Sequence, residues 1–373
     1  MRGHCFVNGV EKHVKCAYVG VNGKAQYIMK PPGIIKYGGN VENLSIARDD
    51  LAATTVGNYA LFGGGVSGSG TSYTTYDAVD AYNSSLTRTT ATSLSKPRCN
   101  FTSTTVGNYA LFGGGYTGSA ALSTVDAYNS SLTRTTATNL SVAGYYFAST
   151  TVGDYALFGG GCYSSSMYKQ TNRVNAYNPS LTRTAATNLS VARQYLSATT
   201  VGNYALFGGG YSTTKDLSSA VDAYDSSLTR TTVTNLSKPR CNLASTTVGN
   251  YALFGGGSTV SSGSIYSTVD AYNSSLTRTT ATSLNIARCD LGATTIDNYA
   301  LFGGGYGNDG NHSFSSCVDV YNSDLIRTDA PRMKTYKTDI IGITIGKYAV
   351  FNGHSSSVDR EMDVYTYNDG YIP

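Results

Sequence analysis

Six basic residues occupy one position of a repeated unit, and their charge is the most evident binding chemistry in the sequence. Guanidinium and ammonium groups bind carboxylates through charge-assisted hydrogen bonds. If these groups surround one mouth of a channel, they would bind an acidic ligand, although Asp50 and Asp290 would neutralise part of their charge. If they instead donate hydrogen bonds to backbone carbonyls, their role is structural. Gly144 interrupts the series. This basic set consists of Arg48, Arg98, Arg193, Arg240, Arg288 and Lys337.

A second set of candidate binding residues is aromatic and lies in segments that differ between repeats. These segments are rich in Ser, Gly, Thr and Tyr, a composition that resembles an antibody paratope, where Tyr supplies rigid contact area and Ser and Gly supply adaptable polar contacts. Surface loops also vary where nothing constrains them. We interpret the variation as recognition, and the candidate tyrosines are Tyr73, Tyr116, Tyr163, Tyr211, Tyr266 and Tyr306.

Motifs for catalysis and for metal binding are missing from the sequence. It contains neither a G-x-S-x-G nor an H-E-x-x-H motif. The acids that recur, such as Asp80, Asp126, Asp222 and Asp270, hold equivalent positions, which indicates structure, because a catalytic set is normally asymmetric. The four His are scattered without metal-ligand spacing. We therefore expect a non-enzymatic protein with no cofactor and no metal.

Composition and hydropathy exclude some classes of partner. Charged residues are 13% of the chain and the formal net charge is +4, too little for a dedicated nucleic-acid binder. No apolar run approaches the roughly 18–20 residues that span a bilayer, so no membrane insertion is expected. The N-terminus has no apolar secretory segment. The chain is expected to be made in a bacterial cytoplasm and to reach the exterior by another route, such as lysis.

A repeat of nearly 50 residues must position all of these side chains. The sequence Tyr-Ala-Leu-Phe-Gly-Gly-Gly stands at 59–65, 109–115, 155–161, 204–210, 251–257 and 299–305, and 348–354 is an altered copy. A period near 50 with a strand that ends in Gly-Gly is typical of a propeller blade. The repeat predicts an all-β array that buries its faces by stacking units side by side.

One repeat predicts four antiparallel strands. In the unit 101–149, residues 101–106 are rich in β-branched side chains, and Gly107-Asn108 is a hairpin signal. The apolar run 109–112 suits a buried strand, 124–128 alternates, and 132–137 forms a polar outer strand.

This pattern resembles the kelch-repeat family over about residues 34–373. Pro97-Arg98, Tyr109–Gly114 and Tyr128-Asn129 match the family's basic residue, Gly-Gly strand and Tyr in order. The resemblance implies a seven-bladed β-propeller. One departure is that the chain has no Trp, so packing between blades must rely on Tyr, Leu and Phe. The residues near the missing Trp positions are Arg88, Arg134, Arg183, Arg230, Arg278 and Arg327.

The two ends of the chain predict how the propeller closes. The seventh unit has strands at 340–345, 348–351 and 361–367 and then lacks an outer strand. Residues 34–44 precede the first full unit and align with the outer strands of the others. We therefore expect 34–44 to be the outer strand of blade seven, within a propeller domain at 34–373.

Residues 1–33 form a separate segment with a short repeat. The related stretches 7–14 and 21–28 each contain Asn-Gly, which predicts two small hairpins, although a partly disordered terminus is the alternative. Residues 17–24 resemble short β repeats in tail-associated proteins of bacteriophages and prophages of Gram-positive bacteria. The resemblance implies that 1–33 attach the chain to a phage tail or baseplate protein.

Together these observations predict a tail-associated receptor-binding protein of the virion. Its variable loops would recognise a host cell-surface glycan or protein, with possible multimeric display. The alternatives are an intracellular kelch scaffold for protein–protein interaction and a sugar-processing enzyme.

Overall fold

The computed structural model describes residues 3–7, 10–14, 17–21, 24–29, 34–39, 41–68, 73–163, 169–212, 216–259, 263–310, 312–355 and 361–368. Regular structure in these residues consists of β-strands. No helix in this part of the chain has the length and apolar character needed to cross a bilayer.

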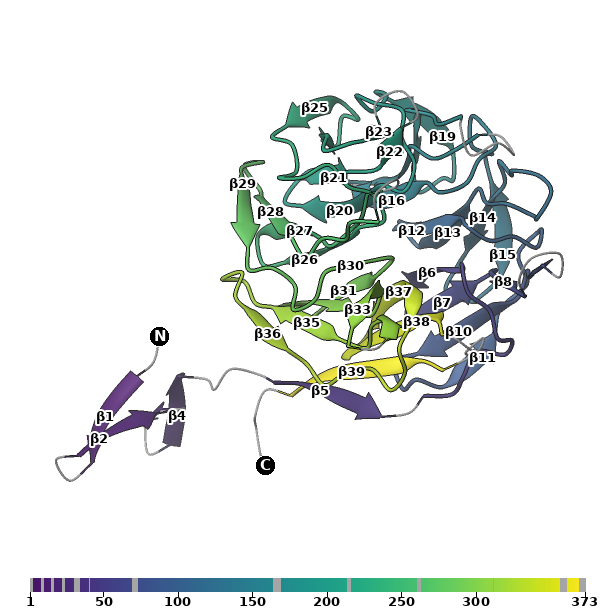
Figure 1. The fold of residues 1–373 in the computed structure, drawn as a ribbon. Coiled ribbons are helices and arrows are strands. Elements are labelled where there is room, and N and C mark those ends of the chain that lie inside the picture. Colours follow the sequence, from purple (N-terminus) through teal and green to yellow (C-terminus); the bar gives the residue numbers. More distant parts are fainter. Residues whose placement is uncertain are drawn as a thin grey trace.

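Four-stranded antiparallel sheets, here called blades, follow one another around a central axis (Figure 1). From the inner to the outer strand, blade 1 consists of β6 (Ala52–Val56), β7 (Tyr59–Gly63), β10 (Val79–Asn83) and β11 (Arg88–Thr90), and blade 2 of β12 (Thr102–Val106), β13 (Tyr109–Gly113), β14 (Val125–Tyr128) and β15 (Arg134–Ala137). In the same order, blade 3 consists of β16 (Ala148–Val152), β17 (Tyr155–Gly159), β18 (Val174–Tyr177) and β19 (Arg183–Ala186), and blade 4 of β20 (Ser197–Val201), β21 (Tyr204–Gly208), β24 (Val221–Tyr224) and β25 (Arg230–Val233).

Three further blades complete the series among the described residues. Blades 5 to 7 are β26 (Ala244–Val248), β27 (Tyr251–Gly255), β28 (Val269–Asn273) and β29 (Arg278–Ala281); β31 (Gly292–Ile296), β32 (Tyr299–Gly303), β35 (Val318–Tyr321) and β36 (Arg327–Asp329); and β37 (Thr338–Ile345), β38 (Tyr348–His354), β39 (Asp363–Asn368) and β5 (Ile34–Gly39). The prediction of an all-β propeller of four-stranded antiparallel sheets is confirmed.

The remaining strands form short ladders outside the blades. They are β1 (Gly3–Val7) with β2 (Val10–Val14), β3 (Ala17–Val21) with β4 (Lys24–Met29), β8 (Val66–Ser67) with β9 (Thr74–Thr75), β22 (Tyr211–Ser212) with β23 (Asp216–Leu217), and β33 (Tyr306–Asp309) between β30 (Arg288–Cys289) and β34 (His312–Phe314). The first two ladders fall where the sequence predicts hairpins. The Asn-Gly pairs at 8–9 and 22–23 lie outside the described residues.

The N-terminal strand β5 pairs antiparallel with β39, so one blade contains both ends of the propeller segment. The ladder places Tyr37 opposite Tyr365, and their rings meet edge to face at 5.7 Å. The predicted outer strand 34–44 is too long, because β5 ends at Gly39. Residues 41–44 lead toward the inner strand of blade 1, and Leu44 is buried there.

Apolar clusters join each blade to the next. One cluster packs Leu51 and Phe62 of blade 1 against Ile343 and Val350 of blade 7, which brings the last blade against the first. Because a single four-stranded blade is too thin to bury both faces, this packing supplies the core.

The glycine run is required by the same packing. A Cβ on Gly113 would lie 2.7 Å from the Phe158 ring of the next blade. Gly114 has a φ of +72°, and a Cβ there would lie 2.7 Å from the carbonyl oxygen of Gly144. Only glycine combines that backbone conformation with such close approach.

Candidate functional site

The basic set is buried inside the blades and not open at the channel mouth. Arg98 is fully buried, and its Nη2 lies 2.8 Å from Oδ2 of Asp126. The same nitrogen donates to the carbonyl oxygen of Phe112 at 3.2 Å. The expectation that these groups bind an acidic ligand is therefore corrected, because their charge is already neutralised away from solvent. The equivalent pairs are Arg48–Asp80, Arg193–Asp222, Arg240–Asp270, Arg288–Asp319 and Lys337–Asp363.

Each of these aspartates except Asp363 also pairs with an arginine on the outer strand of its blade. Arg134 places Nη1 3.0 Å from Oδ1 of Asp126, and Ser95 donates to Oδ2 from its backbone nitrogen and its hydroxyl. The arginines near the missing Trp positions thus anchor the outer strand by charge. A buried carboxylate is stable only when such partners surround it.

Blade 3 lacks both members of the inner pair. Gly144 replaces the arginine, and Asn175 replaces the aspartate on β18. Arg183 of the outer strand still reaches Asn175, with Nη1 3.5 Å from Oδ1. The loss of both charges together supports a structural role for the pair in the other blades.

The candidate tyrosines lie on the face where the chain passes from one blade to the next. Isolated bridges join Cys99 to Tyr116 and Gln194 to Tyr211, and β30 pairs Cys289 with Tyr306. Each bridge ties a connection between blades to the loop that follows the glycine run. The variable loops therefore surround one mouth of the channel.

These tyrosines differ in how far they are open to a partner. Tyr73, Tyr163 and Tyr306 are 39%, 43% and 46% exposed, respectively. Tyr116 and Tyr211 are half-buried at the rim. Tyr266 is half-buried too, with the Lys238 ammonium 4.9 Å from its ring centre. The three exposed rings are the better candidates for contact with a macromolecule.

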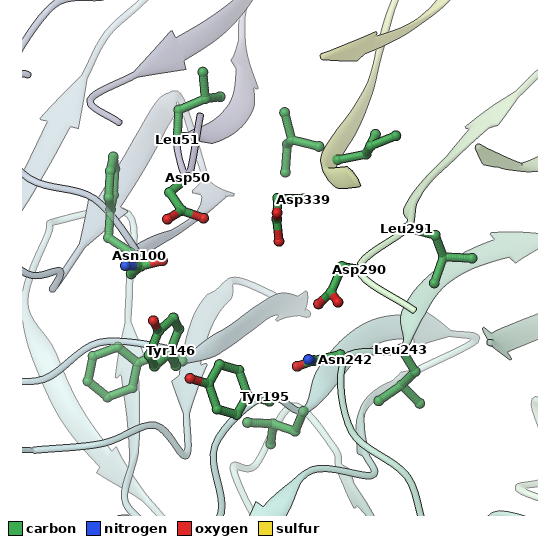
Figure 2. A pocket seen from close by; sticks show the side chains of 15 residues that line it. Asp50, Leu51, Asn100, Tyr146, Tyr195, Asn242, Leu243, Asp290, Leu291 and Asp339 are labelled. Atoms are coloured by element: carbon green, nitrogen blue, oxygen red, sulfur yellow. The ribbon is translucent and has the colours of Figure 1, made fainter. Parts of the chain in front are cut away.

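A cavity of about 260 Å³ opens at this mouth. Seven of its residues, here called the mouth residues, each stand two positions after the basic set or its replacement, and Figure 2 shows them around a common opening. They all have φ between +49° and +57°. The mouth residues are Asp50, Asn100, Tyr146, Tyr195, Asn242, Asp290 and Asp339.

The backbone of the mouth residues is linked from blade to blade. The Asn100 nitrogen donates to the Asp50 carbonyl at 3.1 Å, and the Tyr146 nitrogen donates to the Asn100 carbonyl at 3.0 Å. The left-handed conformation suits Asp and Asn but is unusual for a bulky residue such as Tyr146 or Tyr195. Such strain tends to persist at functional sites.

One half of the opening is acidic. Asp290, Asp339 and Asp50 enter blades 6, 7 and 1, so they are neighbours although far apart in sequence. Burial, followed by the charges of Asp49 and Asp290, raises the pKa of Asp50 to about 7. Asp339 is exposed at the opening. Partial desolvation, followed by the charges of Asp290 and Asp50, raises the pKa of its carboxyl group. The mouth contains acidic side chains, whereas one of the two interpretations of the sequence placed the basic set there.

The other half of the opening is aromatic and neutral. The rings of Tyr146 and Tyr195 lie 4.3 Å apart between centres, and Tyr145 meets Tyr146 at 4.9 Å. Burial raises the pKa of Tyr146, so its hydroxyl stays protonated. Asn100 and Asn242 flank the pair with amide groups that both donate and accept.

The sequence contained a signal for this site. The position two residues after each basic residue changes between Asp, Asn and Tyr while its surroundings repeat. The sequence pattern alone assigns Asp50 and Asp290 only a neutralising role beside the basic set. Among the described residues, no three His, Cys, Asp or Glu side chains are grouped to hold a metal ion.

The fold and this mouth define a β-propeller with an asymmetric polar pocket. The solved structure titled "Structure of YjhT" is similar over 78% of this chain and 99% of its own, with a TM-score of 0.60 and 11% sequence identity. At that identity the likeness shows the propeller fold alone. No protein-family profile matches the chain, and no curated protein matches it either.

Proposed function

We propose that this protein is a non-enzymatic binding module whose loop face recognises a glycan or protein on a host cell surface. The observation that carries the proposal is the asymmetry of that face. Its mouth joins acidic, amide and aromatic side chains in one cavity, and Tyr73, Tyr163 and Tyr306 are exposed around it. Aromatic anchors beside adaptable polar groups are typical of recognition surfaces.

The N-terminal ladders support a place for the module on a phage tail. Two short ladders precede the propeller, and residues 17–24 resemble short β repeats of tail-associated proteins. We infer that 1–33 attach the chain to a tail or baseplate protein and that the propeller is presented outside the cell. Display of several copies would raise the avidity of weak single sites.

A sugar-processing enzyme is a second candidate because of the raised carboxyl pKa values. A carboxyl group whose pKa lies near 7 is suited to general acid–base catalysis. The aspartates that repeat inside the blades are neutralised by arginine and hold equivalent positions, whereas a catalytic set is normally asymmetric. We therefore favour binding over catalysis. An intracellular scaffold on the same face is the third candidate, and it would require no tail complex.

Binding to glycan arrays and to whole bacteria tests the proposal. The intact chain is compared with a variant in which Tyr73, Tyr163 and Tyr306 are changed to Ala. Ile326→Ala is the control, because Ile326 is also an exposed hydrophobic residue but lies in the turn before β36. We expect the triple variant to lose binding by about tenfold or more and the control to retain it.

Three outcomes separate the candidates. Absence of binding by the intact chain to any glycan or cell contradicts the proposed function. Turnover in a panel of sugars by the intact chain favours the enzyme. Copurification with a single soluble protein, without cell binding, favours the scaffold.

A further inference from the structure

Two carboxyl groups in the mouth cavity have no partner. Within the part of the chain that the structure describes, no hydrogen bond or ion pair engages the side chain of Asp50 or Asp339. Asp50 is half-buried at the edge of the cavity. Its backbone carbonyl accepts from Asn100, so the main chain is satisfied while the carboxyl group points into the opening (Figure 2).

The charges that act on these two groups are themselves negative. Asp49, Asp290 and the pair's mutual repulsion all disfavour ionisation. Asp49 lies beside His354, with Nδ1 2.8 Å from Oδ2, and a protonated imidazole there would offset its charge. Asp290 accepts only a weak hydrogen bond from the thiol of Cys289, at 3.1 Å.

Three neutral groups complete the surroundings of Asp50. They are the hydroxyls of Tyr73 and Tyr146 and the thiol of Cys99. Burial raises the pKa of Cys99 to about 12 and raises those of both tyrosines further. None of the three supplies positive charge, so among the described residues no cation lies beside the carboxyl groups of Asp50 and Asp339.

We propose that the mouth cavity binds a primary ammonium group on a flexible stem, as in a lysine side chain of a partner protein. The ammonium donates three hydrogen bonds, which suits Asp50, Asp290 and Asp339 on one wall. The rings of Tyr146 and Tyr195 and the apolar side chains in the same cavity offer carbon surface for the methylene stem. This inference rests on the proposed function, since it names the group that the loop face receives.

Other ligands fit the cavity less well. A neutral sugar offers these carboxyl groups no opposite charge once they ionise, and an anion would be repelled. The volume of about 260 Å³ is below the usual range for a drug-sized ligand, roughly 300–1,000 Å³, so one side chain suits it better than a chain of sugars. Lysine, with a pKa of about 10, also remains charged where Asp339 ionises.

Isothermal titration calorimetry with a blocked Gly-Lys-Gly peptide tests the inference. The same peptide with an acetylated lysine, and glucosamine as a sugar amine, are the comparison ligands. We expect the lysine peptide alone to bind, with at least about tenfold higher affinity at pH 9 than at pH 6, because bound ammonium requires ionised carboxylates. Binding at pH 7 should release protons to the buffer.

Matched variants locate the binding. Asp50→Asn and Asp339→Asn should each weaken the lysine peptide about tenfold, as expected for loss of a charged hydrogen-bond partner. Asp324→Asn removes the same charge from an exposed turn before β36 and should leave the affinity unchanged. Thermal unfolding checks that each variant is folded.

Equal binding of the lysine and acetyl-lysine peptides, or no binding of either, overturns the inference. Binding of glucosamine without the lysine peptide overturns it in favour of a glycan. If the intact chain binds bacteria and Asp50→Asn binds them equally well, the inference fails while the proposed function stands. If the lysine peptide binds and bacteria do not, the proposed function fails instead.

Discussion

The interior of a blade and the mouth of the channel contain the same kind of acid in opposite surroundings. Asp126 is fully buried between Arg98 and Arg134 and accepts from Ser95. Asp50, at the mouth, has no cationic partner among the described residues and a pKa raised to about 7. The repeated acids are neutralised by arginine or lysine, whereas Asp50 and Asp339 at the mouth are not. The comparison indicates which carboxylates hold the fold and which are available for a ligand.

The largest effect is expected from removing the buried charge. Asp126→Asn leaves Arg98 buried without its carboxylate, which should lower the free energy of unfolding by about 3–5 kcal/mol. The matched control is Asn175→Ala in blade 3, where Gly144 replaces the inner arginine. It should cost only about 1–2 kcal/mol, because it loses a hydrogen bond from the Ser141 nitrogen and a long one from Arg183. Urea unfolding of both variants measures this, and equal losses would contradict the comparison.

Removing a carboxyl group from the mouth should stabilise the protein at high pH, whereas removing Asp126 should destabilise it. The folded-state pKa of Asp50, about 7, lies above the usual value of about 4 in an unfolded chain. The folded state therefore binds more protons between these values, and stability falls as pH rises through this window. The Asp50→Asn side chain cannot ionise. The melting temperature of this variant minus that of the parent should therefore rise by roughly 2–4 °C between pH 4 and pH 8.

Thermal melts across that pH range provide the measurement. Asp324→Asn, at an exposed turn, serves as the control and should show no such gain. A difference between Asp50→Asn and the parent that stays constant with pH would mean that Asp50 ionises freely in the folded state.

The repeat made most of the fold predictable. Glycine runs and β-branched segments fixed the blade strands, since both act through local backbone preference and nearest-neighbour packing. The sequence predicted β5 to be too long. Its pairing with β39 ends at Gly39, and the alignment of 34–44 with other outer strands does not show where that pairing ends.

The site was less predictable for two physical reasons. The sequence does not state which side of a connection a side chain takes, so it left open whether Arg98 and its equivalents face the mouth or point into the blade, where they are buried. Asp50, Asp290 and Asp339 share only their position two residues after a basic residue, which does not by itself indicate a site. Asp50 comes beside the other two only when blades 7 and 1 meet, and the backbone at all three is left-handed.

The smallest effect is expected where blade 3 departs from the others. Asn175→Asp places a carboxylate at a buried site that Arg183 alone can approach, because Gly144 supplies no inner partner. Its folded-state pKa should be raised, so the variant should match the parent near pH 4 and lose about 1 kcal/mol by pH 8. Urea unfolding at the two pH values measures this loss.

Restoring the missing arginine sharpens the same test. A Cβ on Gly144 would lie 2.7 Å from the Phe147 ring and 2.5 Å from the carbonyl oxygen of Cys162, so Gly144→Arg needs Phe147→Leu and a small backbone shift. Leucine already stands at that position in blades 4 to 6, as Leu196, Leu243 and Leu291. The triple variant with Asn175→Asp should regain the loss at pH 8 if the pair itself stabilises a blade. A further loss would mean that blade 3 is adapted to Phe147, and that the charged pair is one of two equivalent ways to fill the site.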